Sequence, residues 1–218
     1  AAEELLVHLA DQAMYVAKSL GRNRVVSAKD LHTYKKKEYE KRSEDRKWLL
    51  NTILSIARAV EVKDSYTHSH SEMVSRYASA IASMMGLPDE EVKRISIAGL
   101  LHDVGKIGIP DSILNKEGSL TDEEYELMKT HPVLGYNILA CVDELQNILP
   151  YVLHHHERPD GKGYPDRLTS GEIPQGAKII AVADAFHSMV SARPYRKNPL
   201  TTETAAAELK RGRGTQFD

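Results

Sequence analysis

Apolar side chains recur along most of this chain at the three- and four-residue spacing of an amphipathic helix. The first such segment covers residues 3–20, and a second covers residues 29–62. The second is densely charged from Lys35 to Lys47 and apolar afterwards. Its regular apolar positions are Leu49, Ile53, Ile56, Ala57 and Val60. We therefore predict two N-terminal helices, the second a solvated linker whose C-terminal end faces a core.

Further helices are predicted downstream, whereas strand patterns are scarce. The helical segments are residues 70–86, 88–104, 121–130, 132–142, 145–157, 175–192 and 201–210. Thr121-Asp-Glu-Glu124 is a capping box, and Pro132 suits the first turn of a helix. Only Arg24-Val25-Val26, which follows a helix stop at Gly21, favours a short extended piece. The predicted fold class is all-α: a helical bundle preceded by a linker helix and a short helix-plus-strand segment.

The composition fits one ordinary hydrophobic core and excludes several functional classes. Of 218 residues, 41% are hydrophobic, and 31 acidic residues nearly balance 29 basic ones. The formal net charge of −2 gives no global field for a nucleic-acid polymer or a membrane surface, so local cations must hold any anionic ligand. We see no membrane span and no signal peptide, and we expect a cytoplasmic protein. The single cysteine, Cys141, fits a reducing compartment, and its apolar helical run predicts inert core packing.

The first candidate for chemistry is the segment Gly99-Leu-Leu-His102-Asp103-Val-Gly-Lys106. Neighbouring side chains on a helix differ by about 100° in direction, so His102 and Asp103 can reach one point. Lys106 follows one turn later on the same face. An imidazole, a carboxylate and an ammonium together suggest a metal with a phosphate beside it. A helix C-terminus with a snorkelling lysine and a glycine stop explains the same residues.

Other imidazoles and acids favour the metal interpretation. Seven of the ten histidines lie between residues 68 and 156. His70 lies on the inward stripe of its predicted helix, and His131 precedes a helix N-terminus. His154-His155-His156-Glu157 follows an apolar helix. The alternative for this run is a surface cluster of histidines, and the alternative for His70 is a histidine packed in the core. Asp184 is a single acid in a strongly apolar helix, where a carboxylate is costly unless it is paired or bound to metal.

These segments supply seven nitrogen and oxygen donors. They are His70, His102, Asp103, His131, His155, His156 and Asp184. Seven donors are too many for one octahedral ion and suit two ions bridged by a carboxylate. Two-metal sites, with ions about 3.5–4 Å apart, favour in-line displacement at phosphorus. No Ser or Cys nucleophile with a dedicated base is visible, nor is a P-loop or dinucleotide fingerprint.

The motifs resemble a known family. His70, His102-Asp103 and Asp184 match the H…HD…D signature of the HD phosphohydrolase superfamily. The stretch His155-His156-Glu157-Arg-Pro-Asp160-Gly-Lys-Gly163-Tyr164-Pro165 resembles the motif of its HD-GYP branch. The resemblance runs from about residue 50 to residue 218.

The N-terminal segment resembles a second family. Residues 10–25 look like the closing helix and strand of GGDEF (diguanylate cyclase-like) domains, without the signature loop of that family. No cyclase activity is therefore expected. We expect a C-terminal remnant of a GGDEF-like domain at residues 1–27 and a linker helix at residues 28–45. Residues 46–218 are expected to form an HD-GYP domain with a truncated last helix.

The HD-GYP resemblance implies a metal-dependent phosphodiesterase that opens cyclic di-GMP to pGpG in bacterial signalling, and it leaves open whether pGpG is cut onward to GMP. It implies one metal on His70, His102, Asp103 and Asp184, and a second on His131, His155, His156 and the bridging Asp103. A metal-bridging hydroxide would attack phosphorus, while Lys106 would orient it or bind the phosphate. The implied substrate contacts are Lys162, Gly163, Tyr164, Arg193 and Arg196. Iron or manganese is favoured, and zinc or nickel is compatible.

Three positions depart from the family pattern and leave alternatives open. Tyr66 stands where some members have a glutamate that adds a third metal, so we expect two metals. His187 and Ala192 stand where aspartate is common, which leaves base recognition and turnover rate undecided.

One alternative function is an HD phosphohydrolase for another cyclic dinucleotide or a nucleotide. The other is a signalling module that binds a ligand or partner without turnover. GGDEF-type proteins are candidate partners, and residues 29–60 are a candidate homodimer surface.

Overall fold

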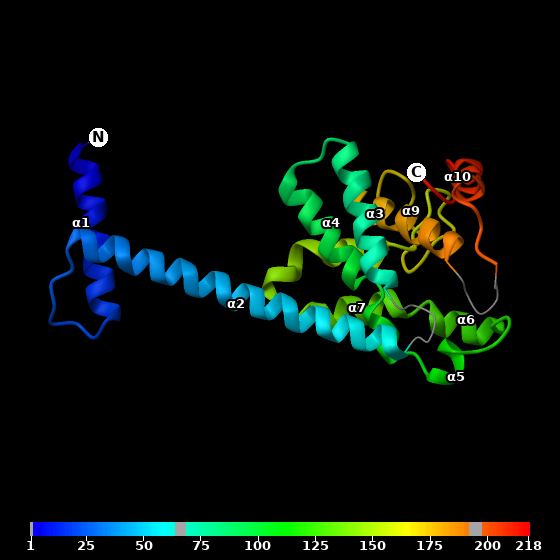
Figure 1. Ribbon diagram of the computed structural model, residues 1–218, viewed down its shortest axis with the longest axis horizontal. Helices are drawn as coiled ribbons and strands as arrows, with labels where there is room; N and C mark the ends of the chain where they lie inside the picture. The colour runs from blue at the N-terminus through cyan, green and yellow to red at the C-terminus, as the bar shows by residue number, and fades with distance from the viewer. Residues whose placement is uncertain (1, 64–68, 192–197) are drawn as a thin grey trace. The chain divides into compact units, whose positions relative to one another are not determined.

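The computed structural model describes residues 2–63, 69–191 and 198–218, and the regular elements among them are helices (Figure 1). Contacts divide the chain into two compact units, Ala1–Ile53 and Leu54–Asp218. The all-α fold class predicted from the sequence is confirmed. Within the described ranges, no helix is both long and apolar enough to cross a membrane.

The first unit consists of α1 (Ala2–Ser19) and the N-terminal part of α2 (Ala28–Lys63). Among its described residues, Val16, Leu31 and Ile53 are the buried hydrophobic ones, whereas Leu5 and Leu6 on α1 are exposed. The two helices therefore bury only part of their apolar surface within this unit.

The predicted strand at Arg24-Val25-Val26 is not formed. Residues 24–27 are irregular, and Val25 is 95% exposed. A strand needs a neighbouring strand to pair its backbone N–H and C=O groups. The described residues of this unit offer none, so the local preference for an extended chain is not enough.

The second unit begins with the C-terminal part of α2 and continues through a series of shorter helices. They are α3 (His70–Met84), α4 (Asp89–Leu101), η1 (Val104–Gly108), α5 (Asp111–Leu114), α6 (Asp122–Met128), α7 (His131–Leu139), η2 (Asp143–Ile148), α8 (Leu149–His154), α9 (Gln175–Val190) and α10 (Thr202–Arg211). The turns η1 and α5 were not predicted. The helix predicted at 145–157 is in fact the 3₁₀ segment η2 followed by α8. Pro150 lies in the first turn of α8, because proline cannot donate within a continuing helix.

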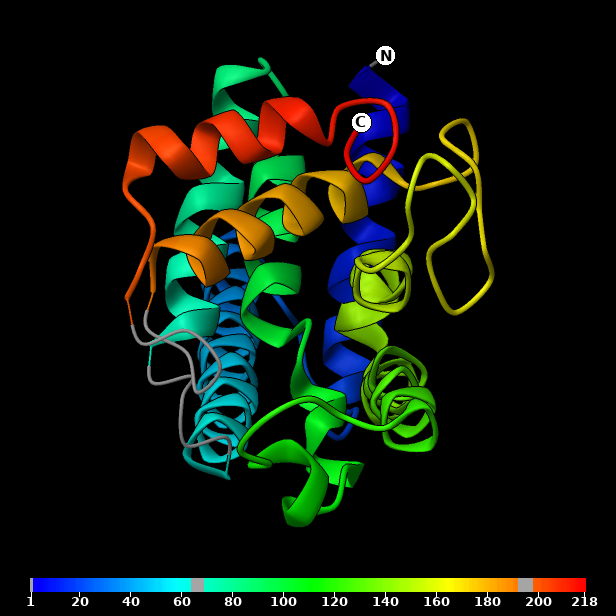
Figure 2. The same ribbon diagram turned by 90° about the vertical axis from the view of Figure 1, so that its right-hand side faces the viewer.

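The core of this unit lies where α3 packs against α4 and α9, and α10 lies along α9 (Figure 2). The apolar residues that meet there are fully or almost fully buried. They include Val74, Ala78 and Ala82 of α3, Ile95 and Ala98 of α4, and Ile180 and Ala183 of α9. Helix α7 packs against η1 and α8. This arrangement brings the ends of α4 and α8, the start of α7 and the middle of α9 into one region.

The C-terminal part of α2 follows the predicted apolar stripe with one exception. Ala57 and Val60 are buried, whereas Ile56 is 44% exposed. The last residue of the helix, Lys63, donates from Nζ to the carbonyl oxygens of Ile107 and Ile109 at 2.8 and 2.6 Å. These bonds attach α2 to the last turn of η1 and to the residue after it.

The prediction that Cys141 lies in the core is wrong. Its side chain is exposed, and Sγ donates to the carbonyl oxygen of Ile138 at 3.2 Å. Helix α7 ends at Leu139, so the helical spacing that placed Cys141 on the apolar face stops before that residue.

Candidate metal centre

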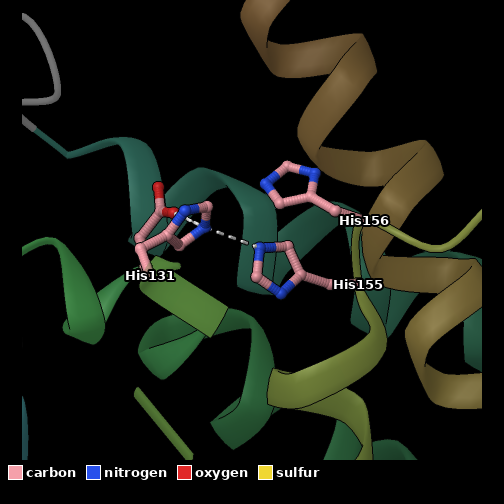
Figure 3. Close-up of side chains that lie close together, drawn as sticks. His131, His155 and His156 are labelled. Carbon is pink, nitrogen blue, oxygen red and sulfur yellow. Dashed lines mark hydrogen bonds and ion pairs between the residues drawn. The ribbon is translucent and has the colours of Figure 1, made fainter. Parts of the chain in front are cut away.

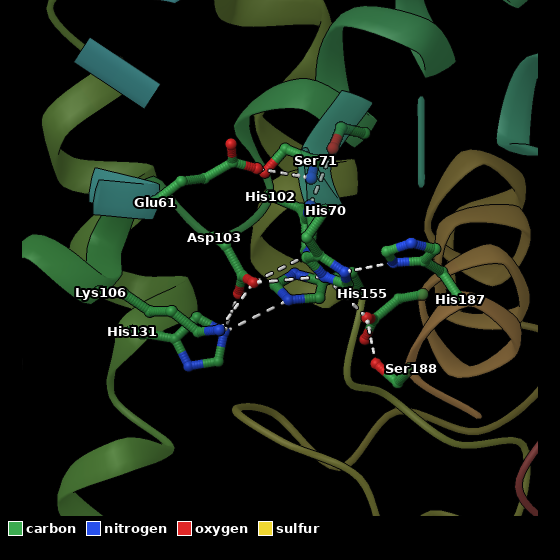
Figure 4. Close-up of polar contacts among 12 residues, drawn as sticks. Glu61, His70, Ser71, His102, Asp103, Lys106, His131, His155, His187 and Ser188 are labelled. Carbon is green, nitrogen blue, oxygen red and sulfur yellow. Dashed lines mark hydrogen bonds and ion pairs between the residues drawn. The ribbon is translucent and has the colours of Figure 1, made fainter. Parts of the chain in front are cut away.

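Asp103 lies between α4 and η1, next to His102, at the centre of the polar cluster (Figure 4). Its Oδ2 is 3.2 Å from Nε2 of His102 and 3.8 Å from Nε2 of His70. Its Oδ1 is 3.3 Å from Nε2 of His131. The ammonium of Lys106 contacts Oδ2 at 2.8 Å. The two carboxylate oxygens therefore face two different sets of imidazoles.

Two groups of donors that could each hold a metal ion meet at this carboxylate. One group is Asp103, His131, His155 and His156, and the other is His70, His102 and Asp184. Within each group the donor atoms lie within 4.8 Å of one another. Figure 3 shows the three imidazoles of the first group facing a common space. The fold thus brings together all seven residues singled out from the sequence.

Three of the imidazoles are fixed by the same backbone hydrogen bond. Nδ1 of His102, His131 and His155 lies 2.8, 2.9 and 2.7 Å from the carbonyl oxygen three residues earlier. A carbonyl oxygen only accepts, so Nδ1 carries the proton and Nε2 presents its lone pair. Metal-binding histidines are characteristically oriented in this way, by a hydrogen bond from the nitrogen that does not face the metal.

The Nε2 lone pairs of His102, His131 and His155 need a cation to accept them. Nε2 of His131 and Nε2 of His155 lie 3.3 Å apart, and two lone pairs at that distance repel each other (Figure 3). Nε2 of His102 is fully buried and makes no hydrogen bond. Buried polar atoms without partners are costly. Because imidazole and carboxylate donors suit divalent transition metals, the residues present fit two such ions.

The electrostatics of the cluster favour charged acids and neutral imidazoles at Asp103, Asp184, His155 and His156. His102 is the exception, because Asp103 more than offsets the effect of burial and raises its pKa. Burial opposes the charge of Asp103, but His102 and Lys106 hold the pKa of this carboxyl well below its usual range. Burial likewise opposes the charge of Asp184, and His70 more than offsets it, so its pKa is also well below the usual range. Burial and neighbouring imidazoles lower the pKa of His155 strongly and that of His156 to about 3. The acids are therefore charged and these two imidazoles neutral at pH 7.

A glycine makes the approach of η1 to α7 feasible. A Cβ atom on Gly105 would lie 1.9 Å from the carbonyl oxygen of His131. Only glycine lets the turn after Asp103 lie directly on the first residue of α7. This close approach is what places the Asp103 carboxylate beside the His131 ring.

The loop after α8 lies against the first group of donors. A Cβ atom on Gly163 would lie 2.5 Å from Cα of Glu157, so this residue packs on the backbone just after His156. Tyr164 donates its backbone N–H to the carbonyl oxygen of His156 at 3.2 Å, and the two rings have centroids 4.8 Å apart. Lys162 is exposed on the same loop.

Glu157 holds this loop, a role that sequence reasoning did not assign to it. It is buried and accepts the backbone N–H groups of Asp166 and Leu168 at 2.7 and 3.0 Å. His154, Glu157 and Asp166 also form a third group of potential metal donors. Both oxygens of Glu157 already accept hydrogen bonds and Asp166 is exposed, so we attribute loop positioning to this group. The only sequence signal was the place of Glu157 directly after the histidines.

Four residues that the sequence analysis singled out lie outside the part of the chain that the structure describes. They are Tyr66, Ala192, Arg193 and Arg196. The structure therefore gives no geometry for the expected arginine contacts or for the position that led us to expect two metals.

The family model described as HD domain matches residues 35–218. The chain belongs to the HD domain family. This assignment covers α3, α4, α7, α8 and α9, the helices that contribute the donors or end beside them.

Curated relatives of this HD domain are similar in sequence over much of its length. The chain is 46% identical over 169 residues to the cyclic di-GMP phosphodiesterase response regulator RpfG of Xanthomonas campestris, covering 77% of this chain and 44% of that protein. It is 48% identical over 152 residues to a cyclic di-GMP phosphodiesterase of Thermotoga maritima, covering 69% of this chain and 41% of that protein. It is 38% identical over 168 residues to the 3′3′-cGAMP-specific phosphodiesterase 2 of Vibrio cholerae, covering 76% of this chain and 32% of that protein. The chain thus spans less than half the length of these relatives.

Solved structures agree on the fold. Bd1817, described as an HDG"Y"P protein from Bdellovibrio bacteriovorus, has a TM-score of 0.58 at 22% identity, over 78% of this chain and 56% of that one. The HD domain of L. monocytogenes phosphodiesterase PgpH, solved in complex with cyclic-di-AMP, has a TM-score of 0.51 at 21% identity, over 72% and 83%.

Proposed function

We propose that this protein is a metal-dependent phosphodiesterase of the HD-GYP branch that hydrolyses cyclic di-GMP to pGpG and onward to GMP. The observation that carries the proposal is the position of Asp103, whose two oxygens face two separate groups of metal donors. The substrate is supported by relatives named cyclic di-GMP phosphodiesterases at 46% and 48% identity.

The donors divide between two cations in this proposal. His70, His102 and Asp184 would hold one, His131, His155 and His156 the other, and Asp103 would bridge them. We propose iron or manganese, given the mixture of imidazole and carboxylate donors, with zinc and nickel as other candidates. When bound, the two cations would supply Lewis-acid charge to the phosphodiester and lower the pKa of a water molecule.

The side chains around the donors have distinct roles in the proposed reaction. Lys106 places an ammonium 2.8 Å from Asp103, where it can also donate to a phosphate oxygen or orient the attacking water. Tyr164, beside His156, would contact the substrate together with Lys162 and Gly163. We keep Arg193 and Arg196 as proposed phosphate contacts, because guanidinium groups bind phosphate in a bidentate manner.

The experiment is metal analysis together with product analysis. The protein is purified anaerobically, supplied with Mn²⁺ and incubated with cyclic di-GMP. We expect two metals per chain and the appearance of pGpG, followed by GMP. Two metals without any product would contradict hydrolysis of cyclic di-GMP and leave another substrate or a binding module. No metal under any condition would contradict the mechanism.

A second substrate merits the same assay. One relative at 38% identity is named a 3′3′-cGAMP-specific phosphodiesterase, so another cyclic dinucleotide is the specific alternative. Competition between cyclic di-GMP and 3′3′-cGAMP at equal concentration would distinguish the two. A higher kcat/KM for 3′3′-cGAMP would replace the proposed substrate and keep the reaction.

We further propose that residues 1–27 are the end of a GGDEF-like domain and residues 28–45 a linker to an HD-GYP domain at 46–218. Leu5 and Leu6 on α1 are exposed, which supports the proposal that this helix belongs to a larger domain that would cover them. A homodimer through α2 and an association with GGDEF-type proteins are both consistent with such an arrangement. Size-exclusion chromatography with light scattering would test the dimer.

A further inference from the structure

His70, a proposed metal ligand, is the first residue of α3, and the residue before it does not cap that helix. The first N–H groups of a helix have no partner within the helix, and a side chain at the N-cap position commonly accepts one of them. Ser69 occupies this position, but its backbone is in the left-handed region at φ 62° and its side chain makes no capping hydrogen bond. The start of α3 therefore depends on a partner from elsewhere in the chain.

Glu61, in the last turn of α2, supplies that partner. Its Oε1 accepts the backbone N–H of Ser71 at 2.6 Å, as an N-cap side chain would (Figure 4). Ser71 is 6% exposed, so water is a poor substitute for the carboxylate. A negative charge at a helix N-terminus is also favourable, because the first N–H groups carry partial positive charge. Glu61 thus caps α3 from a different helix.

The last turn of α2 is itself tied to η1 and to the chain after it. Lys63 donates from Nζ to the carbonyl oxygens of Ile107 and Ile109 at 2.8 and 2.6 Å. The carbonyl oxygen of Lys63 accepts a hydrogen bond from Nδ2 of Asn115 at 3.1 Å. Glu61 therefore reaches α3 from a helix end that these hydrogen bonds anchor.

The His70 ring can serve as a ligand only while its backbone stays in place. The residue is 2% exposed, with Nε2 at 3.1 Å from Oδ1 of Asp184 and Nδ1 at 2.7 Å from Nδ1 of His187. Helix ends fray where their N–H groups lack partners. Fraying at the first turn of α3 would move Nε2 of His70 away from Asp184 and His102, the other donors of its group.

We propose that Glu61 is a positioning residue that holds the backbone of His70 where metal binding requires it. It acts through the N–H of Ser71. The proposal rests on the proposed function and adds to it a residue outside the donor groups. Its effect is on the cation held by His70, because the imidazoles of the other group come from α7 and the end of α8. Helix α2 thus takes part in metal binding, although none of its described residues is a donor in either group.

The first test follows the amide of Ser71 by hydrogen exchange and needs no added metal. Glu61→Ala removes the carboxylate, whereas Glu61→Gln removes the charge and keeps an accepting oxygen. We expect exchange at Ser71 to be about tenfold faster in Glu61→Ala and close to the wild-type rate in Glu61→Gln. Arg58→Ala is the control, since it removes only an exposed ion pair with Glu72 between the same two helices, and it should exchange like the wild type.

The second test measures Mn²⁺ binding by electron paramagnetic resonance and needs no turnover. We expect Glu61→Ala to weaken one of the two ions by about tenfold and to leave the other within about twofold, with Glu61→Gln restoring most of the loss. His70→Ala removes the ligand through which Glu61 acts. Adding Glu61→Ala to that variant should therefore change the affinity for the remaining ion by less than about twofold. A general loss of structure would weaken the remaining ion in the double variant as well.

Equal exchange at Ser71 in Glu61→Ala and the wild type would overturn the proposal, as would a loss of Mn²⁺ affinity that is the same with and without His70. A wild-type protein that binds no Mn²⁺ contradicts the proposed function, while exchange at Ser71 still decides whether Glu61 holds α3. A wild-type protein that binds two ions and cleaves cyclic di-GMP, with Glu61→Ala unchanged in both tests, contradicts only the role of Glu61.

Discussion

The Nδ1 atoms of His70 and His187 lie 2.7 Å apart, so one imidazole donates a hydrogen bond to the other (Figure 4). The other ring nitrogen of His70 faces Asp184 at 3.1 Å, and that of His187 lies 2.9 Å from Oγ of Ser191. If Nε2 of His70 gives its lone pair to a cation, Nδ1 must carry the proton and donate to His187. His187 is therefore a positioning residue for a proposed metal ligand.

Replacing this partner should weaken metal binding. We expect His187→Ala to lower the affinity for Mn²⁺ by about tenfold or more, because outer hydrogen-bond partners of metal ligands contribute on that scale. His187→Asp should retain most of the affinity, since a carboxylate accepts the same N–H. Titration followed by electron paramagnetic resonance measures both, with His32→Ala, an exposed position, as the control. An alanine variant that titrates like the wild type would exclude the positioning role.

The bridging role of Asp103 predicts a loss at both metal positions. Asp103→Asn keeps the shape but removes the charge that faces the two groups of donors. We expect fewer than two metals per chain and a decrease in hydrolysis by a factor of about 10² or more. Metal analysis and the cyclic di-GMP assay measure these effects, and Asp143→Asn, an exposed acid on η2, is the control. Two retained metals with normal turnover would rule out the bridge.

Local sequence signals predicted most of the fold because their physical causes are local. The capping box at Thr121 and Glu124 is formed, with both reciprocal hydrogen bonds. Pro132 lies in the first turn of α7, as its missing N–H group requires. Such features depend on residues within one helical turn, so they are readable without the rest of the chain.

Properties that depend on distant residues were not predictable in this way. Cys141 has an apolar neighbourhood in sequence but lies beyond the end of its helix. The contact between His70 and His187 joins residues 117 positions apart, and no spacing rule predicts it. The seven donors were found from their chemistry, whereas their division into two groups around Asp103 came from the resemblance and has its geometric counterpart only in the folded chain.

Acid should destabilise the metal-free protein. Burial, together with His131, lowers the pKa of His156 from 6.5 to about 3. Between these values the unfolded chain binds a proton at this position that the folded chain does not, so the free energy of unfolding falls as the pH falls. Burial acts on His155 in the same direction. Asp103 raises the pKa of His102 against the effect of burial, so this single imidazole acts in the opposite direction and offsets part of the decrease.

Urea unfolding in the presence of a chelator, at pH 8, 7, 6 and 5, measures this dependence. We expect a constant midpoint down to about pH 7 and a progressive decrease below it. His156→Gln removes one of the titrating groups and should show a smaller decrease. A midpoint that is the same at pH 8 and pH 5 would contradict the neutral, buried state of these imidazoles.

The two backbone hydrogen bonds to Glu157 predict how the loop that carries Tyr164 is held. Glu157→Gln replaces one accepting oxygen by an amide NH₂, which cannot accept from the backbone N–H of Asp166 or Leu168. One partly buried N–H group then loses its partner, at a cost of about 1 kcal/mol in the free energy of unfolding. Because Gly163 packs on the Glu157 backbone, the same change loosens the segment beside His156.

Hydrogen exchange at residues 166 and 168 should therefore accelerate in Glu157→Gln and stay at the wild-type rate in the exposed control Glu117→Gln. Unchanged exchange at both amides would show that the loop is held by its glycine and proline turns rather than by this carboxylate.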